Sequence, residues 1–104
     1  MRITTSTTDG VTVLEVTGEV DLSSADQLRD TAIAALTPYG GTLRIDLAGV
    51  SFMDSTGLGA LMAVYDHAGD QHRVLIQNPR RNVRRILEFT GLDQVFVPRN
   101  GEPS

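Results

Sequence analysis

The sequence contains no cysteine and no lysine, and each absence removes a class of chemistry. Without cysteine, the chain has no disulfides, thiolate metal sites or cysteine nucleophiles, which is compatible with a reducing compartment. Without lysine, a P-loop lysine and a Schiff-base lysine are excluded, and all 9 basic residues are arginine. No apolar run approaches the roughly 18–20 residues that span a bilayer. We therefore expect a cytoplasmic protein with no membrane partner.

Composition places the chain among single globular domains. Its 104 residues suffice for one core, and 40% of them are hydrophobic while 21% are charged. The net charge of −4 argues against direct binding to nucleic acid, which normally needs a basic face. Only Arg80, Arg81, Arg84 and Arg85 form a basic cluster, and no aromatic residue interleaves with them for base stacking. A solvated helix face is favoured there, followed by an acidic protein partner, with nucleic acid last.

Hydrophobic periodicity and turn signals predict a β-hairpin followed by alternating helices and strands. A turn at Asp9-Gly10 joins the first two strands, and Gly18 is expected to mark a bend or bulge in the second. Ser24-Ala25-Asp26-Gln27 has the form of a capping box. The expected strands are 3–7, 11–20, 43–50, 74–76 and 95–97, and the expected helices are about 24–36, 55–67 and 79–90. This order predicts an α/β fold with a mixed sheet covered by helices.

Proline and glycine mark the expected ends of the helices. Pro38 and Gly40-Gly41 should stop the first helix, and Gly69 the second. Pro79 suits the first position of the third helix, where a missing N–H does no harm, and Gly91 resembles a C-cap.

The most informative stretch is Val50–Gly59, where an apolar strand ends in Asp54, Ser55 and Thr56 before a helix begins. Backbone N–H groups and the positive end of the helix macrodipole meet at such a turn, so a phosphate placed there would be stabilised. The two hydroxyls are therefore candidate phosphate acceptors. The alternative is that Asp54 or Ser55 serves only as a helix cap.

The helix that follows carries two glycines, Gly57 and Gly59, in its interior. Each costs roughly 0.5–1 kcal/mol relative to alanine, which predicts the close approach of another surface. The inner face of this helix is expected to carry four residues at helical spacing, Leu58, Leu61, Met62 and Tyr65.

Enzymatic chemistry at this turn is not supported. A hydrolase that used Ser55 would need a general base within hydrogen-bond reach, and the helical rise places His67 roughly 18 Å away. His67 and His72 lack the further ligands of a metal site, and Gly57-Leu58-Gly59 is only a fragment of a dinucleotide fingerprint. A receiver domain phosphorylated at Asp54 would need a lysine and an acidic pair, which the sequence lacks. We expect no enzyme activity, no metal and no cofactor.

Ser51–Gly59 resembles the signature of the STAS domain, and specifically that of the bacterial anti-sigma factor antagonists. Gly18-Glu19-Val20-Asp21 and Thr90-Gly91-Leu92 resemble the other landmarks of the family in the same order, so the resemblance covers about residues 2–98. It implies a STAS domain over residues 1–98, with a mixed four- to five-stranded sheet and helices packed against it. A flexible tail is expected at 99–104.

The family resemblance also implies a switch. Ser55 would be phosphorylated by an anti-sigma factor with serine kinase activity, with Thr56 as a secondary acceptor, and a serine phosphatase would reverse the change. Unphosphorylated, the domain would bind the anti-sigma factor and release a sigma factor. The residues implied to contact this partner are Asp21, Ser23, Asp54, Ser55, Thr56, Gly57, Leu58 and Gly59. For Asp21 and Glu19, helix capping and strand termination are equally weighted alternatives.

Physical chemistry accounts for the off state, since a phosphoserine carries about −1.5 to −2 charge and would lie beside Asp54. A second class of function is a non-switching STAS adaptor in a stress-signalling or lipid-transport complex. Only the identity of the partner separates the two classes, although a complete motif with its hydroxyl favours the switch. A weak homodimer is also left open.

Overall fold

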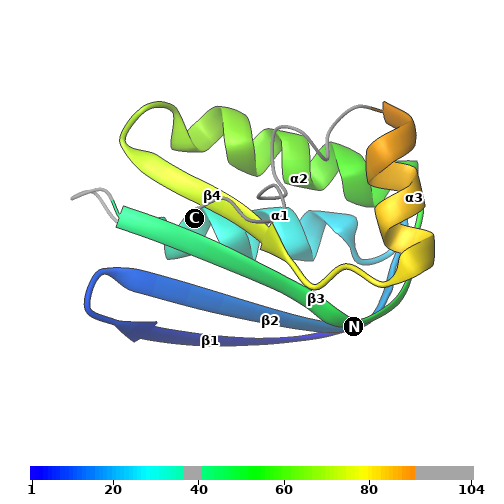
Figure 1. The fold of residues 1–104 in the computed structure, drawn as a ribbon, viewed down its shortest axis with the longest axis horizontal. Coiled ribbons are helices and arrows are strands. Elements are labelled where there is room, and N and C mark those ends of the chain that lie inside the picture. Colours follow the sequence, from blue (N-terminus) through cyan, green and yellow to red (C-terminus); the bar gives the residue numbers. More distant parts are fainter. Residues whose placement is uncertain (37–40, 91–104) are drawn as a thin grey trace.

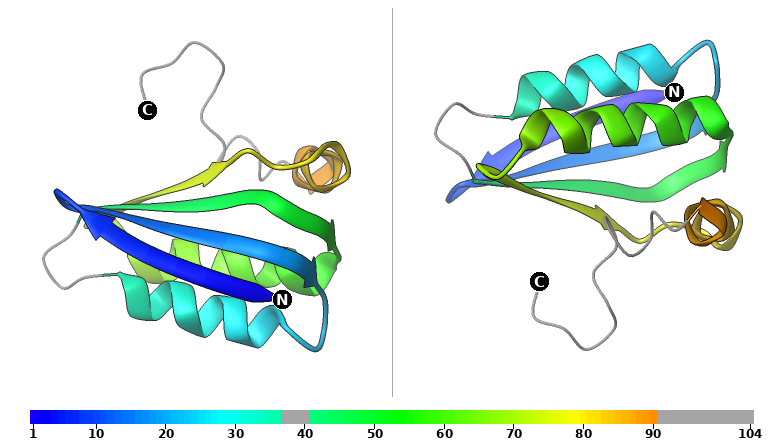
Figure 2. Two further views of the ribbon diagram at one scale, coloured as in Figure 1. Left: turned by 90° about the horizontal axis from the view of Figure 1, so that it is seen from below. Right: turned by 90° about the horizontal axis from the view of Figure 1, so that it is seen from above.

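The computed structural model describes residues 1–36 and 41–90, and it arranges them as one sheet with helices on both sides (Figures 1 and 2). The elements are β1 (Arg2–Thr8), β2 (Val11–Val20), α1 (Ala25–Ala35), β3 (Gly41–Met53), α2 (Ser55–Ala68), β4 (His72–Gln77) and α3 (Arg81–Thr90). The strand order is β1-β2-β3-β4, with β1 antiparallel to β2 and the other neighbours parallel. The predicted α/β fold with a mixed sheet is confirmed.

The hairpin and the bend in β2 form where the sequence predicted them. Asp9 and Gly10 both have positive φ, 51° and 79°, as a type I′ turn requires. Gly18 has a φ of 99°, and the register between β2 and β3 shifts between Gly18 and Glu19. A side chain at Gly18 would also meet the backbone of Met1 at 3.1 Å. Glycine is therefore required at this bulge by both conformation and space.

The main core lies between the sheet and the pair α1 and α2, which cover one face, while α3 lies on the other side (Figure 2). Leu14 and Ile45 of the sheet and Leu28 and Leu61 of the two helices are fully buried. Burial of side chains of this size stabilises the fold by about 1.5–3 kcal/mol each. Within the described residues, no helix is long and apolar enough to cross a membrane.

The capping box predicted for α1 is wrong. Ser24 occupies the N-cap position, but its side chain makes no capping hydrogen bond to the helix. Its hydroxyl instead donates to the carbonyl of Glu19 at 3.0 Å and accepts from the N–H of Asp21 at 3.1 Å. The hydroxyl is used by the preceding turn because the chain leaves β2 and reverses toward α1 within a few residues.

The inner face predicted for α2 is partly wrong, because Tyr65 is 43% exposed and Val64 and Ala68 are buried in its place. Contact with α1 and β4 turns this face of the helix inward. The start predicted for α3 is also wrong. Asn78 has a positive φ of 56°, so Pro79 still belongs to the connection and the helix begins at Arg81.

Several predictions fall outside the described residues. These are the stop of the first helix at Pro38 and Gly40, the C-cap at Gly91, the strand at 95–97, the domain boundary at residue 98 and the tail at 99–104.

Candidate functional site

The site lies where the carboxyl ends of two parallel strands meet. Val20, the last residue of β2, is paired with Met53, the last residue of β3. The N–H of Asp54 also donates to the carbonyl of Val20 at 3.2 Å. The turn after β2 and the turn at Asp54, Ser55 and Thr56 are therefore side by side. They lie at the carboxyl ends of the parallel strands, where α/β folds commonly place their binding sites.

Asp54 caps α2. Its carboxylate accepts hydrogen bonds from the backbone N–H groups of Thr56 at 2.9 Å and Gly57 at 3.3 Å, and from the Thr56 hydroxyl. The Thr56 hydroxyl contributes most to lowering the pKa of Asp54, the two N–H groups add to it, and desolvation and the nearby Asp21 oppose it. Asp54 thus caps the helix and fixes the turn, and of the two residues that the sequence offered as a cap it is the one that takes this role.

The two candidate phosphate acceptors differ in availability. Thr56 is half-buried and its hydroxyl is held by Asp54. Ser55 is the first residue of α2 and is exposed, and its hydroxyl makes no hydrogen bond within residues 1–36 and 41–90. Ser55 is therefore the hydroxyl that a second protein can reach without breaking the helix cap.

The turn after β2 presents a second carboxylate beside the first. Asp21 accepts from both the hydroxyl of Ser23, at 2.6 Å, and its N–H, at 3.0 Å. These two bonds are the main reason why the pKa of Asp21 is lowered, and the amino group of Met1 adds to the effect. Asp21 raises the pKa of Asp54 slightly, as expected of two nearby like charges. Asp21 and Ser23 thus lie in one surface with the motif.

The motif residues divide into an inner and an outer set. A side chain at Gly57 would meet Met53 Cγ at 2.6 Å and Val20 Cγ1 at 2.9 Å, so the close approach predicted there is confirmed and comes from the sheet. Leu58 is only 7% exposed and belongs to the core. Gly59 is exposed, and a side chain there would meet no atom of residues 1–36 and 41–90 within 4 Å. The close approach predicted at Gly59 is therefore not found among the described residues.

Two exposed apolar side chains that are close to the site in the sequence were not predicted as site residues. Leu22 is 80% exposed and lies between Asp21 and Ser23, while Phe52 is 45% exposed and lies two residues before Asp54. The signal available in the sequence was a leucine in a polar turn, outside any helical or strand periodicity. Side chains alternate along a strand, so Phe52 lies on the opposite face of the sheet from Met53, which packs against Gly57 of α2. Leu22 is therefore the exposed apolar side chain that flanks the site.

The arginine cluster lies at the same end of the sheet, and all four of its residues are exposed, including Arg80. Arg80 precedes α3 and its Nε donates to the carbonyl of Ala48 at 2.8 Å. Asn82 donates to the carbonyl of Ser51 at 2.8 Å, so the start of α3 is tied to β3 just before the motif. The cluster therefore combines a structural contact with an exposed helix face.

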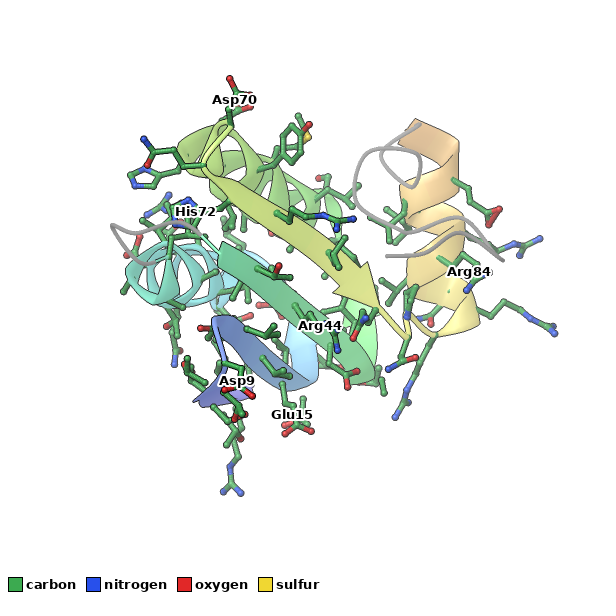
Figure 3. All side chains as sticks on the ribbon, turned by 60° about the vertical axis from the view of Figure 1, so that its left-hand side comes forward. Asp9, Glu15, Arg44, Asp70, His72 and Arg84 are labelled. Atoms are coloured by element: carbon green, nitrogen blue, oxygen red, sulfur yellow. The ribbon has the colours of Figure 1, made fainter. Side chains whose placement is uncertain are left out.

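Catalytic and metal-binding groups are not gathered at the site. His67 is exposed in the last turn of α2, and His72 lies at the end of the sheet opposite to Arg84 and α3 (Figure 3). Among the residues that the structure describes, no three His, Cys, Asp or Glu side chains are placed to hold a metal ion. The site therefore offers an accessible serine hydroxyl at a helix start, near two carboxylates.

Comparison with known proteins identifies the family of the chain. Residues 3–98 match the family model described as "Mlab, STAS domain". The chain is 35% identical to the anti-sigma-B factor antagonist of Bacillus subtilis over 80% of its own length and 76% of that protein. It superposes on the crystal structure of an anti-sigma factor antagonist from Mycobacterium paratuberculosis with a TM-score of 0.77 and 33% identity, over 95% and 86% of the two chains.

A third likeness concerns the fold alone. The phosphorylated form of the Bacillus cell fate determinant SpoIIAA has a TM-score of 0.66 at 24% identity, over 96% of this chain and 93% of SpoIIAA. The chain belongs to the STAS-domain family and, within it, to the anti-sigma factor antagonists. Proteins of this family are regulatory binding proteins rather than enzymes.

Proposed function

We propose that this chain binds an anti-sigma factor through the surface around Ser55, and that phosphorylation of Ser55 ends the interaction. The observation that carries the proposal is the exposed hydroxyl of Ser55, which takes no part in the helix cap formed by Asp54. Leu22 supplies exposed apolar area next to Asp21, and Asp21 supplies a second carboxylate near Asp54. Binding would release a sigma factor in the bacterial cytoplasm.

The covalent step would be a phosphoryl transfer from ATP. A serine kinase, in the anti-sigma factor itself, would form a bond between Ser55 Oγ and the γ-phosphorus as the bond to ADP breaks. The hydroxyl proton would pass to a base of the kinase, because no histidine of the described residues lies near Ser55. A serine phosphatase would restore the hydroxyl by hydrolysis.

Charge and helix geometry explain why the phosphate would change binding but not the fold. The phosphate would add about −1.5 to −2 charge near the carboxylates of Asp54 and Asp21, on a surface that must lose water to bind. The N-terminus of α2 stabilises negative charge, so the domain itself would tolerate the group. The likeness in fold to a protein known in a phosphorylated form supports this tolerance.

The test compares wild type with Ser55→Glu and with Gln71→Glu, a matched variant that adds one negative charge in the exposed turn at the far end of α2. Each protein is used to capture partners from source-cell lysate, and the captured anti-sigma factor is then purified and titrated. We expect wild type and Gln71→Glu to bind equally, and Ser55→Glu to bind at least about tenfold more weakly. The melting temperature of Ser55→Glu should stay within a few degrees of wild type.

Two further observations complete the test. Incubation with the purified partner and ATP should add the mass of one phosphoryl group to wild type, and none to Ser55→Ala. Equal binding by all three proteins, or capture of transport or scaffold components in place of an anti-sigma factor, would contradict the switch and assign the chain to the adaptor class.

A further inference from the structure

β1 is an edge strand with an open outer side. Within the described part of the chain, it is paired only with β2 and forms one lateral edge of the sheet (Figure 1). All of its residues are exposed except Ile3, which is half-buried. Thr5 and Thr7 share the helix-covered face of the sheet with Leu14 and Thr12, their partners on β2, yet both are exposed. The helices therefore do not cover this edge.

The usual protections of an edge strand are absent from β1. Its sequence contains no proline and no lysine, and its only charged residue is Arg2 at the start. Its register with β2 is unbroken from Arg2 to Thr8, whereas the β2–β3 ladder contains irregularities. A strand with an unbroken register, a single charge at its start and backbone groups unpaired within the described residues is a template for pairing with another strand.

The hairpin geometry determines which backbone groups point outward. A two-residue turn is closed by hydrogen bonding between its flanking residues, here Thr8 and Val11. Because hydrogen-bonded and non-hydrogen-bonded pairs alternate along an antiparallel ladder, the N–H and C=O groups of Ile3, Thr5 and Thr7 point away from β2. Any strand added to this edge must pair with these three residues.

We propose that β1 is the dimer interface of this chain, and that it pairs antiparallel with β1 of a second copy about a two-fold axis at Thr5. In this register Thr5 lies opposite the partner's Thr5, and Ile3 lies opposite the partner's Thr7. All outward groups of the three residues are then hydrogen-bonded. The two sheets join into one, which removes both exposed edges.

Charge complementarity favours a second copy over an unrelated strand. Arg2 begins β1 and Asp9 directly follows it, in the turn to β2 (Figure 3). Antiparallel pairing therefore brings Arg2 of each copy toward the partner's Asp9, at both ends of the interface. A single pair of strands buries little apolar area, so the dimer is weak and depends on protein concentration. This interface does not include Ser55 and is independent of the switch.

The two-fold axis makes a direct test possible, because a charged side chain introduced at Thr5 lies opposite the same charged side chain of the second copy. Sedimentation velocity over a concentration series should show a monomer–dimer equilibrium for wild type. Thr5→Lys and Thr5→Glu should each weaken the dimer roughly fivefold. An equimolar mixture of the two variants should restore it, since opposite charges then face each other. Ser6→Lys is the matched control, because in this register Ser6 lies opposite the partner's Thr4, and its dimerisation should change less.

Circular dichroism and thermal melting of the variants should match wild type, because Thr5 and Ser6 are exposed. A wild type that stays monomeric at every concentration overturns the proposal. A dimer that is indifferent to charge at Thr5, or that the mixture of variants fails to restore, overturns the assigned interface.

Discussion

The two helices α1 and α2 begin at the same end of the sheet, each just after a strand that is followed by an aspartate. The serine at the start of each helix, however, uses its hydroxyl differently. Before α1, Ser24 is 9% exposed and its hydroxyl holds the turn through Glu19 and Asp21. At the start of α2, Asp54 provides the cap, and the Ser55 hydroxyl is left exposed. A serine at a helix start is available for chemistry when a neighbouring acid performs the capping.

The close packing of α2 is where substitution should change stability most. Gly57→Ala should destabilise the domain by about 1–3 kcal/mol, because its Cβ would overlap Met53 and Val20. Gly59→Ala is the matched control, since its Cβ would meet no atom of the described residues within 4 Å. It should stabilise the helix by about 0.5–1 kcal/mol. Urea unfolding measures both, and equal effects at the two positions would contradict the close approach.

The contrast between the two serines predicts that substitution by alanine changes the free energy of unfolding at one of them and not at the other. Ser24→Ala should lower the free energy of unfolding by about 1 kcal/mol, because it removes the bonds to Glu19 and Asp21. Ser55→Ala should leave the free energy unchanged within error, because its hydroxyl makes no hydrogen bond to the described residues. Denaturation midpoints of the two variants decide the matter, and a large loss for Ser55→Ala would show a structural role for its hydroxyl.

The cap at α2 can be tested without changing Ser55. Asp54→Ala should lower the melting temperature by a few degrees, because the N–H groups of Thr56 and Gly57 lose their acceptor. Asp54→Asn keeps an acceptor oxygen and should stay close to wild type. If the two variants melt together, the carboxylate is not acting as a cap.

The smallest expected effect is on acid stability. The pKa of Asp54 lies below its ordinary value of 3.8 in the folded chain, and that of Asp21 is also lowered. Their contribution to stability is therefore present above 3.8 and is lost as the pH falls through the lower, folded-state pKa. The free energy of unfolding should decline more steeply in acid for wild type than for Asp54→Asn. Parallel curves would contradict this. The effect is small because solvent screens both carboxylates.

Features that depend on neighbouring residues were predicted well from the sequence. The Asp9-Gly10 turn was predicted because it needs only two residues that tolerate positive φ. The start of α2 was predicted because Asp54 caps a helix through its own neighbours. The sequence predicted Tyr65 on the buried face of α2, but Val64 is buried there and Tyr65 is exposed. Both residues continue a helical spacing of apolar side chains, and spacing alone does not say which of the two faces contacts α1 and β4.

The sequence by itself determined the family and the order of the described elements, because these depend on local pattern and motif. Only the tertiary structure decided which parts of the motif reach the surface. Parallel pairing of Val20 with Met53 places Asp21 beside Asp54, although the two lie far apart in the chain. The same packing turns Leu58 into the core and leaves Leu22 exposed. Contacts between segments that are distant in the sequence decide which side chains are buried and which are exposed. No short stretch of sequence contains these contacts.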